Sequence, residues 1–541
     1  MAKGSKKRRR DEPTHDELRG YAETETLFKS NLFRLQTVEL LREVAPFSGT
    51  PLTRLESAVR ALRGELLSLP SAELSSEPRA GAPSVAMPWR APAKVDLVGS
   101  YLLRTTTAPE LNVDVAIQLP AGTLLEKDYL DQRYADKRLL YLTHLAKVLL
   151  ARAKAPASQS VVSSATPPRF VALPHMQAHR WPVLEVHLRD ASAPSSGGDG
   201  ATTTGSREVG GWVVRLLPCL ADDTFPQAKL RPQRCNLRSL GARPSPVYNN
   251  LVRLELGGYR RALALLHHTM AKDSNGALRE AVILLKVWAR QRYSQQAGSV
   301  SGFQLSLVLT HLLATRAINY EMGSYHMLRV TLAFLSKGGL AKGVIRLPGM
   351  PAADADADAD EDEDEEAKAQ SAKAAAAAAA TFASYFPCVL TDSDGAVNYG
   401  CGVSRGALKE LAADAALSLA ALDAPAVSDA ASFAALFTSR RALCASFDAL
   451  LTMRLPPTNA PPPAANGAVA LPAVAANDPT EGEPRPRPPA ACRLPPALRT
   501  HGVVVAPVIV SPAAPLPPPS PVLGPITMPL PNTCPLPRPH R

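Results

Sequence analysis

The chain has 541 residues, enough for three or four domains of ordinary size. Its 60 Lys and Arg against 49 Asp and Glu give a formal net charge of +11, which favours an anionic partner, with nucleic acid first. Of the 51 prolines, 26 fall from Pro456 onward, where they prevent regular backbone pairing and predict a disordered tail over 456–541, so one compact globule of the whole chain is excluded.

The seven cysteines are scattered and none forms a C-x-x-C pair, which argues against a zinc site and against a disulfide framework. We expect no metal and no other cofactor. No apolar run approaches the roughly 20 residues of a membrane span, so no membrane partner is expected either.

Residues 1–25 are polar and are expected to be a disordered basic tail. A cluster of cations within them predicts nuclear import or nucleic-acid contact, the alternative being a solvated charged tail. The cluster comprises Lys6, Lys7, Arg8, Arg9 and Arg10.

Residues 26–89 are predicted to form a helical N-terminal segment and a linker. One helix is expected over 27–44 and a second across Leu52–Leu69. The Ser-, Pro- and Ala-rich stretch 71–90 is typical of a linker. The apolar face of the first helix is expected to comprise Phe28, Leu32, Leu35 and Val38.

An α/β domain is predicted over 90–245. It contains strand patterns at 95–100, 112–120, 182–188 and 211–218, a long helix at 128–154 and a Gly-, Ser- and Thr-rich insertion before the last strand. The second strand alternates cleanly, with Val113, Val115 and Ile117 on one face and Asn112, Asp114 and Ala116 on the other.

A helical domain is predicted over 246–345, followed by an acidic and Ala-rich linker over 346–381. The piece 382–455 begins with a hairpin pattern whose turn contains Asp394–Gly395. The helix at 275–292 carries an apolar stripe, and the segment 301–318 is expected to be a buried helix. The stripe comprises Leu278, Ala281, Val282, Leu285 and Trp288.

The sharpest motif is Gly99-Ser100 followed, on the next strand, by Asn112-Val113-Asp114. It resembles the nucleotidyltransferase superfamily of the polymerase-beta type. In that superfamily the Gly-Ser turn approaches nucleotide phosphates, and carboxylates two residues apart share two magnesium ions with a third carboxylate from a neighbouring strand.

This sequence departs from that pattern at two of the three carboxylate positions. Asn112 supplies no negative charge, and Arg215 occupies the inward position of the neighbouring strand, where it repels magnesium and is expected to pair with Asp114. The site Gly99, Ser100, Asn112, Asp114 and Arg215 is therefore interpreted as a remnant without catalytic residues. The alternative is an active RNA nucleotidyltransferase that uses Asp114 with Glu185 and magnesium.

The segments LLKVWARQR (284–292) and SGFQLSLVLTHLL (301–313) resemble the helical domain of poly(A) polymerases and oligoadenylate synthetases. Helix amphipathicity accounts for Trp288 as a core residue. For Lys286, a surface role and a functional role are both left open.

The resemblance narrows to the Nrap family, also called the nucleolar protein six or Utp-twenty-two family. It is carried by VGSYLLRTTTAPELNVDVAIQLP, by EKDYLDQRYADKRLLYLTHLA (126–146) and by VVRLLPCLADDTFPQAKLRPQRCNLR (213–238). The piece after the acidic linker resembles part of that family's third domain, and the chain as a whole resembles a truncated member.

The resemblance implies a catalytically dead protein of the nucleolar small-subunit processome that acts in 18S rRNA maturation. It implies pre-rRNA or small nucleolar RNA as partners, together with processome proteins of the UTP-C subcomplex. It also implies membership of the CURI complex and a role in tRNA export. RNA contact is expected from a basic cluster after the last strand, the alternatives being a solvated loop or a surface that binds acidic proteins. The cluster comprises Lys229, Arg231, Arg234, Arg238 and Arg243.

Overall fold

The fold is taken from a computed structural model, which describes residues 31–45, 50–75, 85–155, 160–173, 181–189, 208–237, 245–293, 298–350, 363–423, 429–438, 449–454 and 503–508. These fall in two compact units, Met1–Arg440 and Arg441–Arg541. In the second unit, β10 (Ala449–Arg454) and β11 (Val503–Val508) pair antiparallel, so a strand lies inside the stretch that was expected to be a disordered tail. All other elements belong to the first unit.

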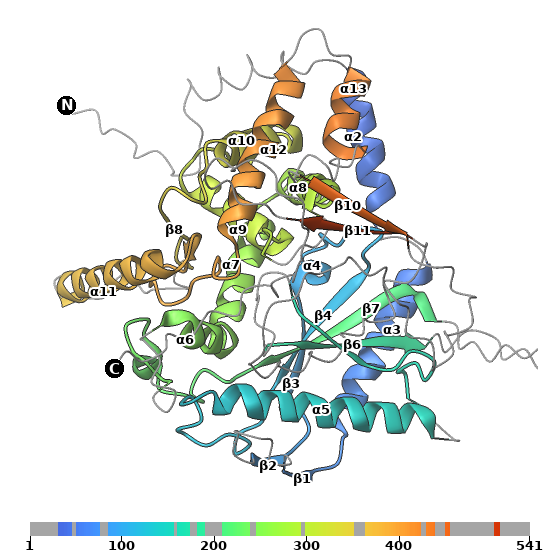
Figure 1. Cartoon of the computed structure of the whole chain (residues 1–541), viewed down its shortest axis with the longest axis vertical. Helices are drawn as coiled ribbons and strands as arrows, with labels where there is room; N and C mark the ends of the chain where they lie inside the picture. Colours follow the sequence, from blue (N-terminus) through green and yellow to red (C-terminus); the bar gives the residue numbers. More distant parts are fainter. Residues whose placement is uncertain are drawn as a thin grey trace, which may run out of the picture. The chain divides into compact units, whose positions relative to one another are not determined.

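The first unit begins with α2 (Asn31–Val44) and α3 (Thr50–Leu67) (Figure 1). The predicted helix is present, but its predicted apolar face is wrong. Phe33 is the residue that packs inward, with its ring 5.2 Å from that of Tyr325 and 5.7 Å from that of Phe433. Apolar residues occur on both sides of this helix, so spacing alone could not identify the buried side. Of the predicted face, Phe28 lies outside the described residues, and the others are exposed, namely Leu32, Leu35 and Val38.

The stretch that was expected to be a linker contains two paired strands. β1 (Ala72–Ser75) and β2 (Ala86–Trp89) run antiparallel. Trp89 is fully buried and stacks on Tyr141 at 5.3 Å between ring centroids, and its indole nitrogen donates to the Tyr141 carbonyl at 3.3 Å. Burial of this large side chain explains why a stretch with the composition of a linker is ordered.

A five-stranded mixed sheet forms the centre of the α/β part, which confirms the predicted class. Its order is β3-β4-β7-β6-β5, with β4 and β7 parallel and the other neighbours antiparallel. The alternation predicted for β4 is present, since Val113, Val115 and Ile117 are all buried. The strands are β3 (Lys94–Val98), β4 (Asn112–Gln118), β5 (Arg169–Val171), β6 (Val183–Arg189) and β7 (Glu208–Cys219).

A buried ion pair joins the long helix α5 (Arg133–Lys154) to the start of the helical part. Arg138 and Glu255 lie 2.8 Å apart, with exposed side-chain fractions of 0% and 1%. Tyr134 donates a short hydrogen bond to the same carboxylate. This pair links α5 to the start of the helical part, and removal of one member would leave an uncompensated buried charge.

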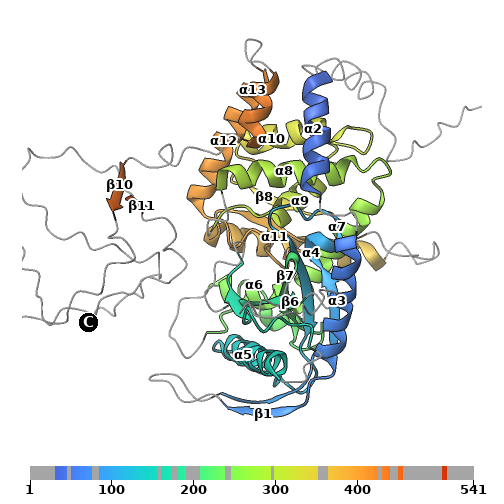
Figure 2. The same ribbon diagram turned by 90° about the vertical axis from the view of Figure 1, so that its right-hand side faces the viewer.

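The predicted helical part follows the sheet in the chain (Figures 1 and 2). All five residues of the stripe predicted on α8 are buried, and most of α9 is buried as expected, including the polar residues Gln304, Ser306 and Thr310. None of the helices in the described ranges is long and apolar enough to span a membrane. The elements are α6 (Pro246–Arg253), η2 (Leu254–Gly258), α7 (Tyr259–Ala271), α8 (Ala277–Tyr293), α9 (Gly302–Ala314) and α10 (Ser324–Ser336).

The chain after the helical part packs back onto it. β8 (Val344–Arg346) pairs in parallel with β9 (Val389–Thr391), and α12 (Arg405–Asp423) packs on α10. The indole nitrogen of Trp288 donates to Ser418 at 2.9 Å, which also confirms Trp288 as a core residue. The remaining elements are α11 (Glu363–Tyr385), α13 (Asp429–Phe433) and η3 (Ala434–Thr438).

Two expectations are corrected by this packing. The Ala-rich half of the predicted linker is helical, as α11. Buried residues of α12 and η3, such as Leu408, Leu411 and Leu436, share one core with α8 and α10, whereas the sequence suggested a separate third-domain piece beginning at 382. A segment of this size buries too little surface to fold alone, and it gains its core by supplying apolar helix faces to its neighbours.

Candidate functional site

A cavity of about 360 Å³ lies between the sheet and the helical part. The polar face of β4 forms one wall, and α8 and the start of α9 form another. Its lining includes the predicted remnant site and two cations of α8, namely Gly99, Ser100, Asn112, Asp114, Arg215, Lys286 and Arg290. The structure thus brings together the five residues of the predicted remnant site, and it adds cations from the helical part, among them Lys286 and Arg290.

Asp114 is engaged by the two residues that replace carboxylates. Arg215 Nε donates to Asp114 Oδ1 at 2.7 Å, and Asn112 Nδ2 lies 3.2 Å from the same oxygen. The side chains of Asp114 and Arg215 are 13% and 25% exposed. The predicted Asp114–Arg215 pair is therefore present, and it neutralises the carboxylate within the cleft.

Glu185 lies in the same cross-strand row, because the strand register places Arg215 opposite both Asp114 and Glu185. Two strand spacings separate the two carboxylates, roughly 10 Å at the backbone. Glu185 is also paired with Arg169 of β5 in a short contact. The row therefore alternates acid and base across four strands.

This arrangement does not fit a pair of magnesium ions. Such a site needs carboxylates that converge on the metal, whereas here an amide and a guanidinium occupy two of the positions. Within the described ranges, no three His, Cys, Asp or Glu side chains are grouped so that they could hold a metal ion.

The Gly-Ser turn at the start of α4 (Gly99–Leu102) packs directly on the carboxylate. Gly99 has φ +71°, and a Cβ atom there would lie 2.5 Å from Asp114 Oδ2. Ser100 Oγ lies 3.1 Å from Thr106 Oγ1. Glycine is therefore required for two independent reasons, namely its left-handed backbone and the close approach of Asp114.

Two cations of α8, one turn apart, bind the loop that precedes β4. Lys286 Nζ donates to the Thr105 carbonyl at 2.7 Å, and Arg290 donates to the Ala108 carbonyl at 2.7 Å and to Thr107 Oγ1 at 2.9 Å. Burial lowers the pKa of Lys286 to about 7, and the neighbouring charge of Arg290 adds to this. Lys286, left open by the sequence, is thus a cleft residue that also joins the two parts of the fold.

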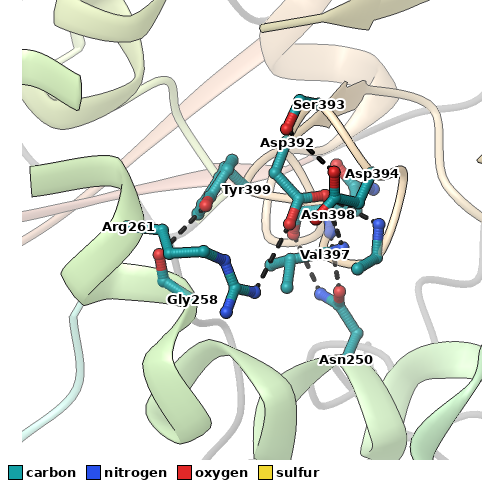
Figure 3. Close-up of polar contacts among 10 residues, drawn as sticks. Asn250, Gly258, Arg261, Asp392, Ser393, Asp394, Val397, Asn398 and Tyr399 are labelled. Atoms are coloured by element: carbon teal, nitrogen blue, oxygen red, sulfur yellow. Dashed lines mark hydrogen bonds and ion pairs between the residues drawn. The ribbon is translucent and has the colours of Figure 1, made fainter. Parts of the chain in front are cut away.

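Sequence reasoning missed a polar cluster around the turn after β9 (Figure 3). Asn250 accepts from the Asn398 amide at 2.7 Å and donates to the Asn398 carbonyl at 2.9 Å. Asp392 accepts from Arg261 at 3.4 Å, and Tyr399 donates to the Gly258 carbonyl at 2.9 Å. The Asp394–Gly395 turn was predicted, with Gly395 at φ +63°, but its partners lie about 140 residues away in sequence and carried no local signal.

The predicted basic cluster is described in part. Lys229, Arg231 and Arg234 are exposed, on the short helical turn η1 (Gln227–Leu230) and the loop after it. Arg238 and Arg243 lie outside the described residues, as does the N-terminal cluster Lys6–Arg10. Assignment of these residues to RNA contact and import stays a prediction.

Two family models match the chain: Nrap protein domain 1 over residues 56–272, and Nrap protein PAP/OAS-like domain over residues 277–440. The second match extends past the helical part to α12 and η3, in agreement with their packing on α10 and α8.

Curated relatives cover much of this chain. Human Nucleolar protein 6 is 33% identical over 448 residues, and the mouse protein is 31% identical over 447. Each alignment covers 77% of this chain and 34% of the relative, so the chain spans about a third of the length of these relatives.

Solved structures align over a similar share of the chain. The Cid1 poly(U) polymerase with magnesium and 3'-dATP aligns over 75% of this chain and 98% of its own, at 12% identity and a TM-score of 0.38. We infer nothing about the chemistry of this chain from a similarity at that level.

Proposed function

Because the chain belongs to the Nrap family, we propose that it is a non-catalytic structural component of the nucleolar small-subunit processome. In this role it binds pre-rRNA and partner proteins during 18S rRNA maturation. Nucleolar localisation, predicted from the sequence, is supported by the curated nucleolar relatives.

The observation that carries the non-catalytic part is the engagement of Asp114 by Arg215 at 2.7 Å, with Asn112 on the same oxygen. A metal-dependent transfer needs negative charge facing the cleft to hold magnesium beside the attacking and leaving oxygens. Here the one carboxylate that remains of the motif, Asp114, is already neutralised by Arg215 of the neighbouring strand β7.

The scaffold part is supported by the joined structure of the unit. Lys286 and Arg290 bind the loop before β4, and Arg138 of α5 pairs with Glu255, so charged groups connect the helical part to the α/β part. Such a unit offers fixed surfaces to partners. We propose pre-rRNA or small nucleolar RNA and proteins of the UTP-C subcomplex as those partners.

Crosslinking of the full chain to RNA in its own cells, followed by sequencing of the bound RNA, tests this function. We expect enrichment of small-subunit precursor rRNA over messenger RNA, and loss of the enrichment in a control without crosslinking. Crosslinks spread in proportion to RNA abundance, with no enrichment of precursor, would contradict the proposal.

A further inference from the structure

The loop that displays Lys229, Arg231 and Arg234 is held from beneath by two buried asparagines. Asn236 and Asn249 are 4% and 1% exposed. Asn249 Nδ2 donates to the carbonyls of Arg231 at 3.0 Å and Arg234 at 2.9 Å. Asn236 Nδ2 donates to the Lys229 carbonyl at 3.0 Å.

The two asparagines are also bonded to each other and to the chain around them. Asn236 Nδ2 donates to Asn249 Oδ1 at 2.8 Å, and the Asn236 carbonyl accepts from the Asp131 amide at 2.7 Å. The Arg234 amide closes a turn onto the Arg231 carbonyl at 3.0 Å. The main chain of all three cationic residues is thus bound on its inner side.

Inward and outward residues alternate along this loop. Leu230 and Pro232 are buried, and Lys229, Arg231 and Arg234 are exposed. Because the carbonyls face the asparagines, the cationic side chains are displayed on a backbone that is already ordered. Binding to a partner would then order only side chains, at a lower entropic cost than ordering the whole loop.

Arg253 of α6 is buried and Arg261 of α7 is paired with Asp392 at 3.4 Å, so the exposed positive charge comes from the loop itself. Guanidinium groups bind phosphate and carboxylate alike through two parallel hydrogen bonds, and closely spaced arginines match the closely spaced phosphates of a nucleic-acid backbone.

We propose that Lys229, Arg231 and Arg234 form a preorganised phosphate-binding loop for RNA, and that Asn236 and Asn249 are its positioning residues. This inference rests on the RNA-binding part of the proposed function. The asparagines touch no RNA in this account and act only through the carbonyls of the cationic residues.

The cationic residues are tested in the full chain with the triple variant Lys229→Gln, Arg231→Gln and Arg234→Gln. Its matched control removes the same charge elsewhere, at the exposed residues Lys337, Lys342 and Arg346. Affinity for a short single-stranded RNA of mixed sequence is measured by fluorescence anisotropy at several salt concentrations.

Each phosphate contact contributes about 0.7 to the slope of log K against log salt for single strands, so the triple variant should lose about 2 from the slope. When salt is raised from about 50 to about 200 mM, the affinity of the wild type should therefore fall by a factor roughly 18 times larger than that of the triple variant. The control variant should keep the wild-type slope. Equal slopes for both variants would overturn the inference.

The positioning role is tested with Asn249→Ala beside Asn250→Ala. Asn250 is the next residue of α6 and equally buried, but it binds Asn398 instead of the loop. We expect a smaller salt slope and weaker RNA binding for Asn249→Ala alone, even where both variants lose similar stability. If Asn249→Ala does not fold, Asn236→Ala takes its place. A folded variant of either asparagine with the wild-type slope would overturn the positioning role.

The outcomes separate this inference from the proposed function. A wild-type chain that binds no RNA would contradict the RNA-binding function itself. RNA binding that is intact in the triple variant would overturn the loop assignment only. If polyglutamate of matched charge binds the wild type more tightly than RNA and the triple variant loses it, the loop binds acidic protein and the RNA assignment is wrong.

Discussion

Replacement of Arg215 by methionine should destabilise the fold, because Asp114 would keep its charge in the cleft without its guanidinium partner. Removal of one partner of a fully buried pair costs about 3–5 kcal/mol, and exposed pairs contribute less than about 1 kcal/mol. The two side chains are 25% and 13% exposed, between these cases. We therefore expect a loss of about 2 kcal/mol.

A double-mutant cycle with Asp114→Asn separates the pair from the packing of the long side chain. Urea denaturation of the wild type, both single variants and the double variant gives the interaction free energy. We expect about 1–2 kcal/mol of coupling, with part of the loss recovered in the double variant. Losses that add within about 0.5 kcal/mol would refute the reasoning, because independent sites behave in that way.

Three further predictions use the same denaturation assay. Gly99→Ala should lower the free energy of unfolding by at least about 2 kcal/mol, because the new Cβ would lie 2.5 Å from Asp114 Oδ2 and φ is +71° at this position. Gly64→Ala, where a Cβ would meet no atom within 4 Å, should be neutral or stabilising. Equal effects of the two substitutions would contradict this. Burial lowers the pKa of Lys286 to about 7, below its ordinary value near 10.4, so between these two pH values the unfolded chain binds more protons than the folded chain. The wild type should therefore gain stability relative to Lys286→Met as the pH rises from about 7 to about 9. Parallel pH profiles of the two proteins would contradict this. Asn250→Ala should lose about 2–4 kcal/mol, since two buried backbone groups of Asn398 lose their partner, and a loss below about 0.5 kcal/mol would show that the contact is dispensable.

Periodicity predicted the parts of the fold in which one face is apolar and the other polar. β4 is such a case, because Val113, Val115 and Ile117 alternate with polar residues that line the cleft. The stripe on α8 is buried as well, but residues outside it, such as Ile283 and Leu284, are also buried, so the stripe does not define a single buried face of that helix. Where apolar residues occur on all sides of a helix, as on α2, the buried side depends on which residues pack against it. Here these residues are Tyr325 and Phe433, which contact Phe33.

Long-range pairing was the part that the sequence did not reveal. β8 meets β9 only after the chain has crossed α11, and β1 pairs with β2 across a stretch with the composition of a linker. Strands of three or four residues carry too few side chains to produce a periodic signal. Their existence depends on contacts made elsewhere, such as Trp89 on Tyr141.

The candidate site was predictable where side-chain chemistry alone defines it. An arginine opposite Asp114 implies an ion pair in any geometry that brings the strands together. The role of Lys286 was not predictable, because it depends on Thr105, a residue 181 positions away. Asn249 likewise gives no sequence signal, since a buried asparagine is recognised only by the carbonyls it binds.

The central claim is that the cleft does not catalyse nucleotide transfer. The most direct measurement is magnesium-dependent incorporation of labelled ATP, CTP and UTP into an RNA primer by the full chain, beside an Asp114→Ala control. The Asp114–Arg215 pair and Asn112 predict no incorporation above that of the control. Incorporation by the wild type that is lost in Asp114→Ala would contradict the account and would require a catalytic role for Asp114.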